Sequence, residues 1–257
     1  MNQEIQNNQT NKSIKLLSLY LKDQKQAQKL GFNSTKIQLY LQQKNYGQAC
    51  LKNFQIYLVQ FQNLKNLSLE MINCKIQGQH LEQFVSSLHK CPNIKYLNLN
   101  FKLSYLQQKS IFSSIHKMQN LKSLKLNLSN CYITDDICQI MLDDILKISN
   151  LSKLLIDLDQ NRLKSIPQLN QMNENLKNFT IILSQNNIKN SQQKQINQWN
   201  FPSLKRLSIQ LDNNEISDTH FIFRNTEQIL NQLIFFEIDL RQSQFLFNIL
   251  NQIILII

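Results

Sequence analysis

The sequence predicts an α/β fold in which short parallel strands build one sheet and helical or irregular segments carry the chain from each strand to the next. Three observations indicate this class. Leucine and isoleucine recur at one characteristic spacing along most of the chain, and several segments between these groups have apolar residues at helical spacing. The chain also holds only three Gly and three Pro, too few for the tight turns of an all-β sandwich or barrel.

The repeat is clearest at residues 121–133, where four leucines at positions 121, 124, 126 and 128 precede Cys131 and Ile133. The first apolar position is occupied in successive copies by Leu64, Ile94, Leu121, Leu151, Leu176, Leu204 and Leu233. These positions are 30, 27, 30, 25, 28 and 29 residues apart. Self-similarity at such a period indicates repeated units that stack on one another.

Each copy is expected to form one strand. Alternation such as Leu124-x-Leu126-x-Leu128 places three apolar side chains on one face of a strand, and stacked units bury that face against each other and against the return segments. We expect seven to nine parallel strands, centred near 67–71 and 124–128 in two of the copies. A small residue follows three positions after the last apolar one, at Cys74, Cys131, Asn161, Asn186 and Asn214. There the chain is expected to turn, with these side chains hydrogen-bonded to the backbone of adjacent turns.

The return segments differ in character. Apolar residues at helical spacing predict helices near 81–88, 111–118 and 137–148, the last starting at Thr134 with Asp135 and Asp136 in its first turn. The segment after Leu163 is shorter and contains Pro167, which predicts irregular or 3₁₀ structure. Residues 189–200 are very polar, so we expect the loosest return there.

The predicted domain organisation is a disordered tail at 1–12 followed by one repeat domain at 13–257. The repeats are clear at about 60–245. Weaker copies at 14–21 and 37–41 have the apolar spacing but no good turn residue, which leaves 13–59 less well defined.

With its LxxLxLxx(N/C)xL pattern, the chain resembles the leucine-rich repeat family over most of its length. Repeats near 28 residues with helical returns are similar to the ribonuclease-inhibitor and Ran GTPase-activating-protein subclass. The resemblance implies a curved solenoid with the parallel sheet on its concave face and the helical or irregular returns on its convex face. One departure is systematic, because the strand motif reads LxxLxLxL. The two added residues keep the alternation, so we expect longer strands without a change of register.

If the resemblance holds, the residues between the inward leucines line the concave face. The candidate partner-binding residues are Glu70, Asn98, Asn100, Lys125, Asn127, Asp157, Thr180, Ser208, Gln210, Glu237 and Asp239. Tyr20 and Tyr40 join them if the weak copies are real. Repeat solenoids bind through such extended surfaces, so we expect a protein-interaction scaffold, alone or within a larger signalling protein. The alternatives are a solvated face without a partner, and a regulator of a small GTPase that acts like a GTPase-activating protein.

The formal net charge of +11 raises the question of an anionic partner. Lysines follow the first apolar residue of five copies, and Lys153 is one position further on, so stacking aligns them along one edge of the solenoid: Lys65, Lys95, Lys122, Lys153, Lys177 and Lys205. This pattern fits either a phosphate-tracking stripe or solvated loop positions, and we favour the second. The chain has only four Arg, and aromatic residues do not interleave with the lysines. No specific nucleic-acid partner is therefore expected.

Motifs for catalysis are absent from the sequence: it has no HExxH, no Gly-rich phosphate loop and no GxSxG. We expect no enzyme activity, no cofactor and no metal. Cys91 follows His89 by two residues, but a structural role for the thiol is favoured over a nucleophile. The five cysteines form no CxxC pair, which together with the absence of a signal peptide suggests reduced thiols in the cytoplasm.

The C-terminal segment is apolar but too short for a membrane span. Two helical faces of residues 245–257 are apolar, and one of them has no predicted partner within the chain. We expect the chain either to self-associate through this segment or to continue in a longer protein; burial of the segment in the core is the alternative.

Overall fold

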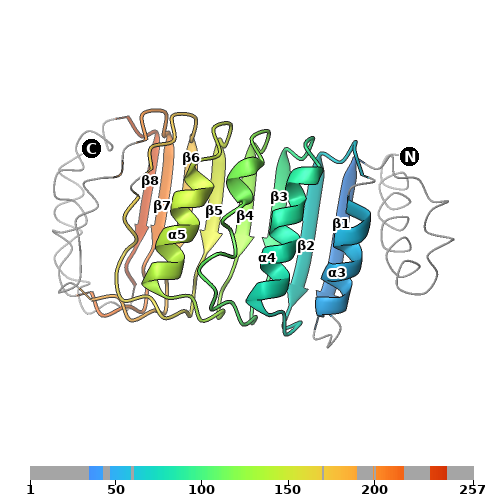
Figure 1. Cartoon of the computed structure of the whole chain (residues 1–257). Helices are drawn as coiled ribbons and strands as arrows, with labels where there is room; N and C mark the ends of the chain where they lie inside the picture. Colours follow the sequence, from blue (N-terminus) through green and yellow to red (C-terminus); the bar gives the residue numbers. More distant parts are fainter. Residues whose placement is uncertain are drawn as a thin grey trace, which may run out of the picture.

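This computed structural model describes residues 35–42, 47–58, 61–169, 171–189, 199, 201–216 and 232–241. These residues form one eight-stranded sheet in which every strand pairs in parallel with the next strand of the sequence, in the order β1 to β8 (Figure 1). The predicted parallel α/β architecture and the strand number are confirmed for this part of the chain.

The strands have nearly uniform positions within the repeats. They are β1 (Lys36–Gln42), β2 (Asn66–Ile72), β3 (Tyr96–Asn100), β4 (Ser123–Asn127), β5 (Lys153–Asp157), β6 (Asn178–Ile182), β7 (Arg206–Gln210) and β8 (Phe235–Asp239). The weak copy at 37–41 is thus a true strand, while the copy at 14–21 lies outside the described residues. The register pairs equivalent leucines across strands, for example Leu67 with Leu97 and Leu97 with Leu124.

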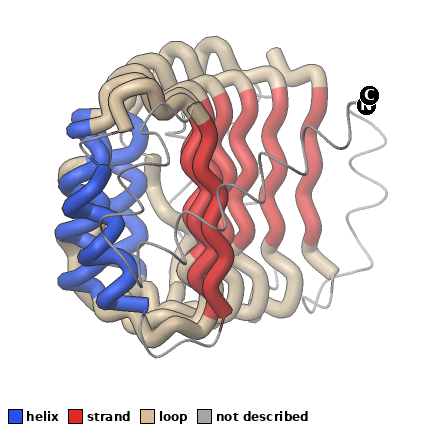
Figure 2. The backbone as a smooth tube through the Cα atoms, turned by 90° about the vertical axis from the view of Figure 1, so that its right-hand side faces the viewer, coloured by secondary structure: helices blue, strands red, loops and turns tan. Residues whose placement is uncertain are grey.

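Among the described residues, three α-helices lie on one side of the sheet: α3 (Gly47–Leu58), α4 (Gly78–Ser87) and α5 (Asp135–Leu146) (Figure 2). Short 3₁₀ helices η1 (Leu88–Lys90) and η2 (Ile115–Lys117) complete two of the returns. The core lies between the helical layer and the sheet. The inward strand residues Leu69, Leu99, Leu126 and Ile156 are fully buried.

The helix expected at 111–118 is not formed. Residues 109–114 are turns, and a single 3₁₀ turn follows at η2. The apolar residues Ile111, Phe112 and Ile115 are nevertheless buried. The helical spacing therefore predicted correctly which residues are buried, but its prediction of an α-helix was wrong.

The predicted start of α5 at Thr134 is confirmed, although the Thr134 side chain makes no capping hydrogen bond. Asp135 has a role between repeats instead. Its Oδ1 accepts hydrogen bonds from the backbone N–H groups of Lys164 (3.0 Å) and Ser165 (3.2 Å) in the following return. The return after Leu163 is irregular through Pro167, as expected.

The expected lengthening of the strands is wrong for β3 to β8, which have five residues each. The fourth apolar residue lies just after the strand. Leu128 is fully buried there, and its N–H donates to the carbonyl of Asp157 at 2.8 Å. Backbone pairing between neighbouring repeats thus continues past the strand into the turn.

The turns use the left-handed backbone region without glycine. The residue before each small turn residue has a positive φ, at Asn73, Leu103, Asn130, Gln160, Gln185 and Asn213. Asn tolerates this region better than most side chains do. Leu103, with φ of 62°, is the least suited of the six.

The small turn residues form the expected ladder. Oδ1 of Asn161 accepts from the N–H groups of Cys131 (3.0 Å) and Ile133 (2.9 Å), and Nδ2 of Asn161 donates to the carbonyl of Leu128 (2.9 Å). Asn186 repeats this pattern on the turn that contains Asn161. The ladder supplies partners to backbone groups that stacking removes from water.

Two sequence predictions fall largely outside the described residues. Of the polar return at 189–200, only Lys189 and Trp199 are described. Trp199 is buried against Phe179, with ring centroids 5.7 Å apart, and its Nε1–H donates to the carbonyl of Pro167 at 3.3 Å. The tails at 1–12 and 245–257 are not described, so the disorder and self-association expected for them stay predictions.

Candidate protein-binding face

The candidate residues lie on the face of the sheet opposite the helices, called here the uncovered face (Figure 2). Their side chains alternate with the buried leucines and are partly or fully exposed, apart from Ser208. The strand register gathers the outward residues into two columns that run across all eight strands. The first column contains Gln38, Ser68, Asn98, Lys125, Leu155, Thr180, Ser208 and Glu237. The second column contains Tyr40, Glu70, Asn100, Asn127, Asp157, Ile182, Gln210 and Asp239.

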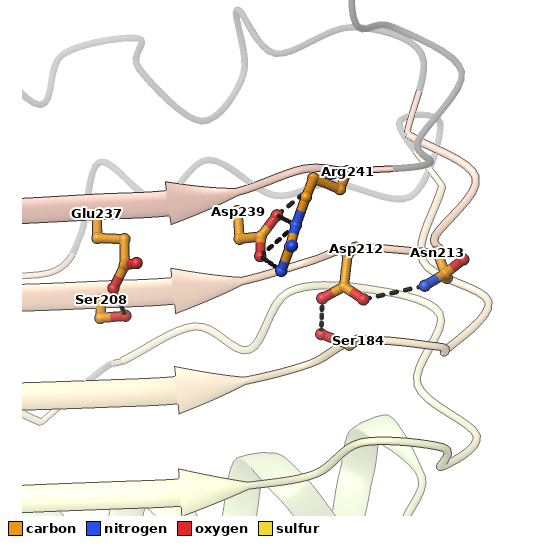
Figure 3. Close-up of polar contacts among 7 residues, drawn as sticks. All are labelled: Ser184, Ser208, Asp212, Asn213, Glu237, Asp239 and Arg241. Atoms are coloured by element: carbon orange, nitrogen blue, oxygen red, sulfur yellow. Dashed lines mark hydrogen bonds and ion pairs between the residues drawn. The ribbon is translucent and has the colours of Figure 1, made fainter.

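Hydrogen bonds in the first column link neighbouring strands. Nδ2 of Asn98 donates to Oγ of Ser68 at 2.8 Å, and the Ser208 hydroxyl donates to Oε2 of Glu237 at 2.9 Å (Figure 3). Oδ1 of Asn98 is buried without a hydrogen-bond partner among the described residues. These contacts orient part of the column before any partner arrives.

The second column has a structural role that the sequence reading missed. Side-chain oxygens of Asn100, Asn127, Asp157 and Asp239 each accept the N–H two residues later, at 3.0–3.2 Å. Such a bond closes an Asx turn. These four residues therefore end their strands, whether or not they also bind a partner. The signal for this role was available, because each is an Asn or Asp at the last position of its strand.

Acidic residues gather where β5 to β8 end. Oδ2 of Asp157 accepts from Nδ2 of Asn127 at 2.8 Å. Desolvation raises the pKa of the Asp157 carboxyl, and desolvation together with the charge of Asp157 raises the pKa of Asp159. Ser184 donates to Asp212 across the next turns (Figure 3).

Asp239 is held differently from these carboxyls. Arg241 binds it with two charge-assisted contacts to Oδ2, from Nε at 3.0 Å and from Nη2 at 2.6 Å, and this guanidinium lowers the pKa of Asp239 (Figure 3). The carboxylate of Asp239 is thus already satisfied within the chain.

Four candidates remain unengaged on the uncovered face. The side chains of Glu70, Lys125, Thr180 and Gln210 make no hydrogen bond or ion pair within the described part of the chain. Tyr40 is 58% exposed. An exposed aromatic ring with unengaged polar neighbours is typical of a protein-binding surface.

Exposed aromatic residues at the start of two strands were missed by the sequence reading. Tyr96 is 51% exposed, and Phe235 is 43% exposed beneath the guanidinium of Arg206, which lies 5.8 Å from its ring centroid. Each lies two residues before a first-column residue, Asn98 or Glu237, so the alternation places both rings on the uncovered face.

The cysteines show structural roles. The Cys91 thiol donates to the carbonyl of Leu58 at 2.9 Å, and burial raises its pKa to about 11. His89 contacts the Ser86 carbonyl instead, at 2.5 Å. Burial also raises the pKa of the Cys131 thiol to about 12. A thiol with so high a pKa is protonated at neutral pH and is a poor nucleophile.

Neither metal ligation nor membrane crossing is indicated in the described part. No group of three or more His, Cys, Asp or Glu side chains among these residues is arranged to hold a metal ion. None of the helices described there has the length and apolar character needed to cross a bilayer.

Comparisons with known proteins give little further information. No model of a known protein family matches the chain, and no curated protein matches it. Among solved structures, the chain is similar to a Bacteroides fragilis protein whose crystal structure was determined by the Northeast Structural Genomics Consortium. The match has 14% identity and a TM-score of 0.38 over 89% of this chain and 70% of that one. A similarity this low assigns neither fold nor function to the chain.

Proposed function

We propose that this chain is a leucine-rich repeat solenoid whose uncovered face is concave and binds another protein. The sequential parallel order of the strands and the asparagine ladder between turns support the solenoid. Proteins built from stacked repeats bind partners through extended surfaces of this kind.

The binding proposal rests on the side chains of the uncovered face that have no hydrogen bond or ion pair in the described part of the chain. Tyr40 and Glu70 are paired in register on β1 and β2, and Lys125 stands exposed on β4. A large amphipathic ring beside charges with no internal partner is suited to burial against a complementary protein surface. The Asx-turn residues next to them hold the strand ends in place and so preorganise the surface.

Affinity capture from the source cells, with bound proteins identified by mass spectrometry, tests this proposal. The informative comparison is between a face variant, Tyr40→Ala with Lys125→Glu, and a control variant, Tyr105→Ala with Lys52→Glu. The control changes a ring of similar exposure (55% against 58%) and an exposed lysine away from the uncovered face. A partner retained by wild type and control but lost by the face variant supports the proposal. Equal retention by all three proteins contradicts it.

We also propose a reducing, cytoplasmic compartment, which is supported by the buried thiols of Cys91, Cys131 and Cys138, none of which forms a disulfide in the described part of the chain. The alternative role, stimulation of a small GTPase, rests on the family resemblance alone. A stimulated GTP-hydrolysis assay checks it.

A further inference from the structure

The edge of the sheet where the strands begin has a continuous row of lysines. The lysine row consists of Lys65, Lys95, Lys122, Lys153, Lys177 and Lys205, in the loops that lead into β2 to β7 or at the first strand position (Figure 1). All six side chains are exposed or partly exposed. We propose that this lysine row binds an extended acidic polypeptide segment.

Backbone bonds align the row. The N–H groups of Lys95 and Tyr96 both donate to the carbonyl of Lys65, at 2.8 and 3.0 Å, and the same paired arrangement recurs from Lys122 to Lys95 and from Lys205 to Lys177. Each lysine is therefore held one strand spacing from the next. At about 4.8 Å per strand, the five steps from Lys65 to Lys205 span about 24 Å.

The charge of the row is not neutralised within the described part of the chain. None of its six lysines pairs with a carboxylate there; the ion pairs involve other cations. The loops at 61–65, 91–95, 118–122, 148–152, 173–177 and 201–205 contain a single acidic residue, Glu174. Like charges in line repel one another, so an anionic partner would relieve a cost already present in the free protein.

A second set of lysines adds positive charge near the same edge. Lys90 and Lys117 end the two 3₁₀ helices and are exposed, and each lies four residues before the first apolar position of the next repeat, Ile94 or Leu121. Their place at helix ends has its own explanation, because cations stabilise helix C-termini. The lysines of the row precede strands, where no helix dipole accounts for them.

The side-chain types favour a polypeptide over a nucleic acid. Lysine carries a compact positive charge on a flexible side chain and can pair with carboxylates from many directions. The planar guanidinium of arginine is better suited to bidentate contacts with phosphate. Between β2 and β7 one exposed ring, Tyr96, stands beside the row, whereas stacking of successive bases needs a series of rings. An extended peptide rises about 3.4 Å per residue, so about seven residues cover the row.

Fluorescence anisotropy with a labelled decaglutamate peptide tests the proposal. The row variant is Lys95→Gln, Lys122→Gln, Lys177→Gln. The matched control is Lys52→Gln, Lys75→Gln, Lys164→Gln, which removes the same charge from exposed positions that belong neither to the row nor to the uncovered face. We expect the row variant to lose affinity by about tenfold or more and the control by less than about threefold. Thermal melting by circular dichroism verifies that both variants fold.

Three outcomes overturn the proposal: no binding of the peptide by wild type at low salt, equal losses in the two variants, or tighter binding of a decacytidylate oligonucleotide than of the peptide. The last outcome would assign the row to phosphate instead. Because the row lies at the sheet edge, these results are independent of the partner of the uncovered face.

Discussion

Asn186 offers the sharpest test of how the repeats hold together. This side chain is 5% exposed and makes five hydrogen bonds to backbone. Its Oδ1 accepts from the N–H groups of Asn161 and Leu163, both at 3.1 Å, and its Nδ2 donates to three carbonyls, including that of Leu158 at 3.0 Å. The substitution Asn186→Ala removes all five bonds at once.

The magnitude follows from the groups left without a partner. The carbonyls of Leu183 and Ser184 keep other donors, Asn214 Nδ2 and Gln160 N–H. Two N–H groups and one carbonyl lose the bonds given above. At about 1–3 kcal/mol for each buried unsatisfied group, and allowing water to reach some of them, we expect a loss of about 3–5 kcal/mol. That is a large share of the stability of an ordinary domain.

Urea unfolding followed by circular dichroism measures this loss, and Asn187→Ala is the matched control. Asn187 is the next residue and is exposed, and its side chain makes no hydrogen bond in the described part of the chain. Its replacement should change the unfolding free energy by less than about 0.5 kcal/mol. Asn186→Cys should recover part of the loss, because Cys131 fills the equivalent position and donates to the Phe101 carbonyl at 3.1 Å. A loss below about 1 kcal/mol for Asn186→Ala would refute the ladder as a main source of cohesion.

Three further substitutions test other parts of the structure. Leu103→Asn should raise stability by about 0.5–1 kcal/mol, because φ at this position is 62° and Asn tolerates it better; a lower melting temperature would contradict this. Leu126→Asp should cost about 4 kcal/mol or more, since the site is fully buried and offers no cation; an unchanged melting curve would show that residue 126 is not inward. Asp159→Asn should stabilise the protein at pH 7, because burial and the charges of Asp157 and Asp212 raise the pKa of Asp159 in the folded state. A group with a raised folded pKa loses stability as pH rises through the window above its unfolded pKa, so the gain should vanish below pH about 4, as melting at several pH values would reveal.

The strands were predictable because burial of their inward residues is a local pattern. Every described strand lies where the leucine spacing placed it, including the weak copy at β1. The number of residues between equivalent positions of successive strands, called here the step, can be read from the sequence and also explains which returns are helical. Steps of 30 residues, as from Leu67 to Leu97 and from Leu124 to Leu154, contain α4 and α5. The 27-residue step to Leu124 has room only for η2.

The 25-residue step from Leu154 to Phe179 contains no helix among its described residues. A shorter return must still reach the start of the next strand, so it crosses the layer in extended turns. The helix expected at 111–118 was wrong because the 27-residue step that contains it is also short. The apolar periodicity predicted which side chains face the core, and the length of the step determined the backbone conformation.

The candidate face was predictable as a set of residues but not as a surface. Alternation marked Glu70 and Lys125 as outward without showing that they stay unengaged. It could not separate them from Asn127 and Asp157, whose oxygens close the turns at the strand ends. That distinction depends on the distance between a side-chain oxygen and an N–H two residues later, which follows from the backbone path of the turn.

Local periodicity therefore sufficed for the sheet, the order of its strands and the identity of the core, because each of these follows from which side chains leave water. Contacts between turns needed the folded structure, because they join residues 25 to 30 positions apart. Stacking of the turns creates the hydrogen-bond ladder through Asn161 and Asn186 and aligns Lys65 with Lys95. It also buries the carboxyls of Asp157 and Asp159 in part, which raises their pKa values. In a chain of stacked repeats, the polar chemistry is set by the neighbouring turn, and a single repeat does not contain it.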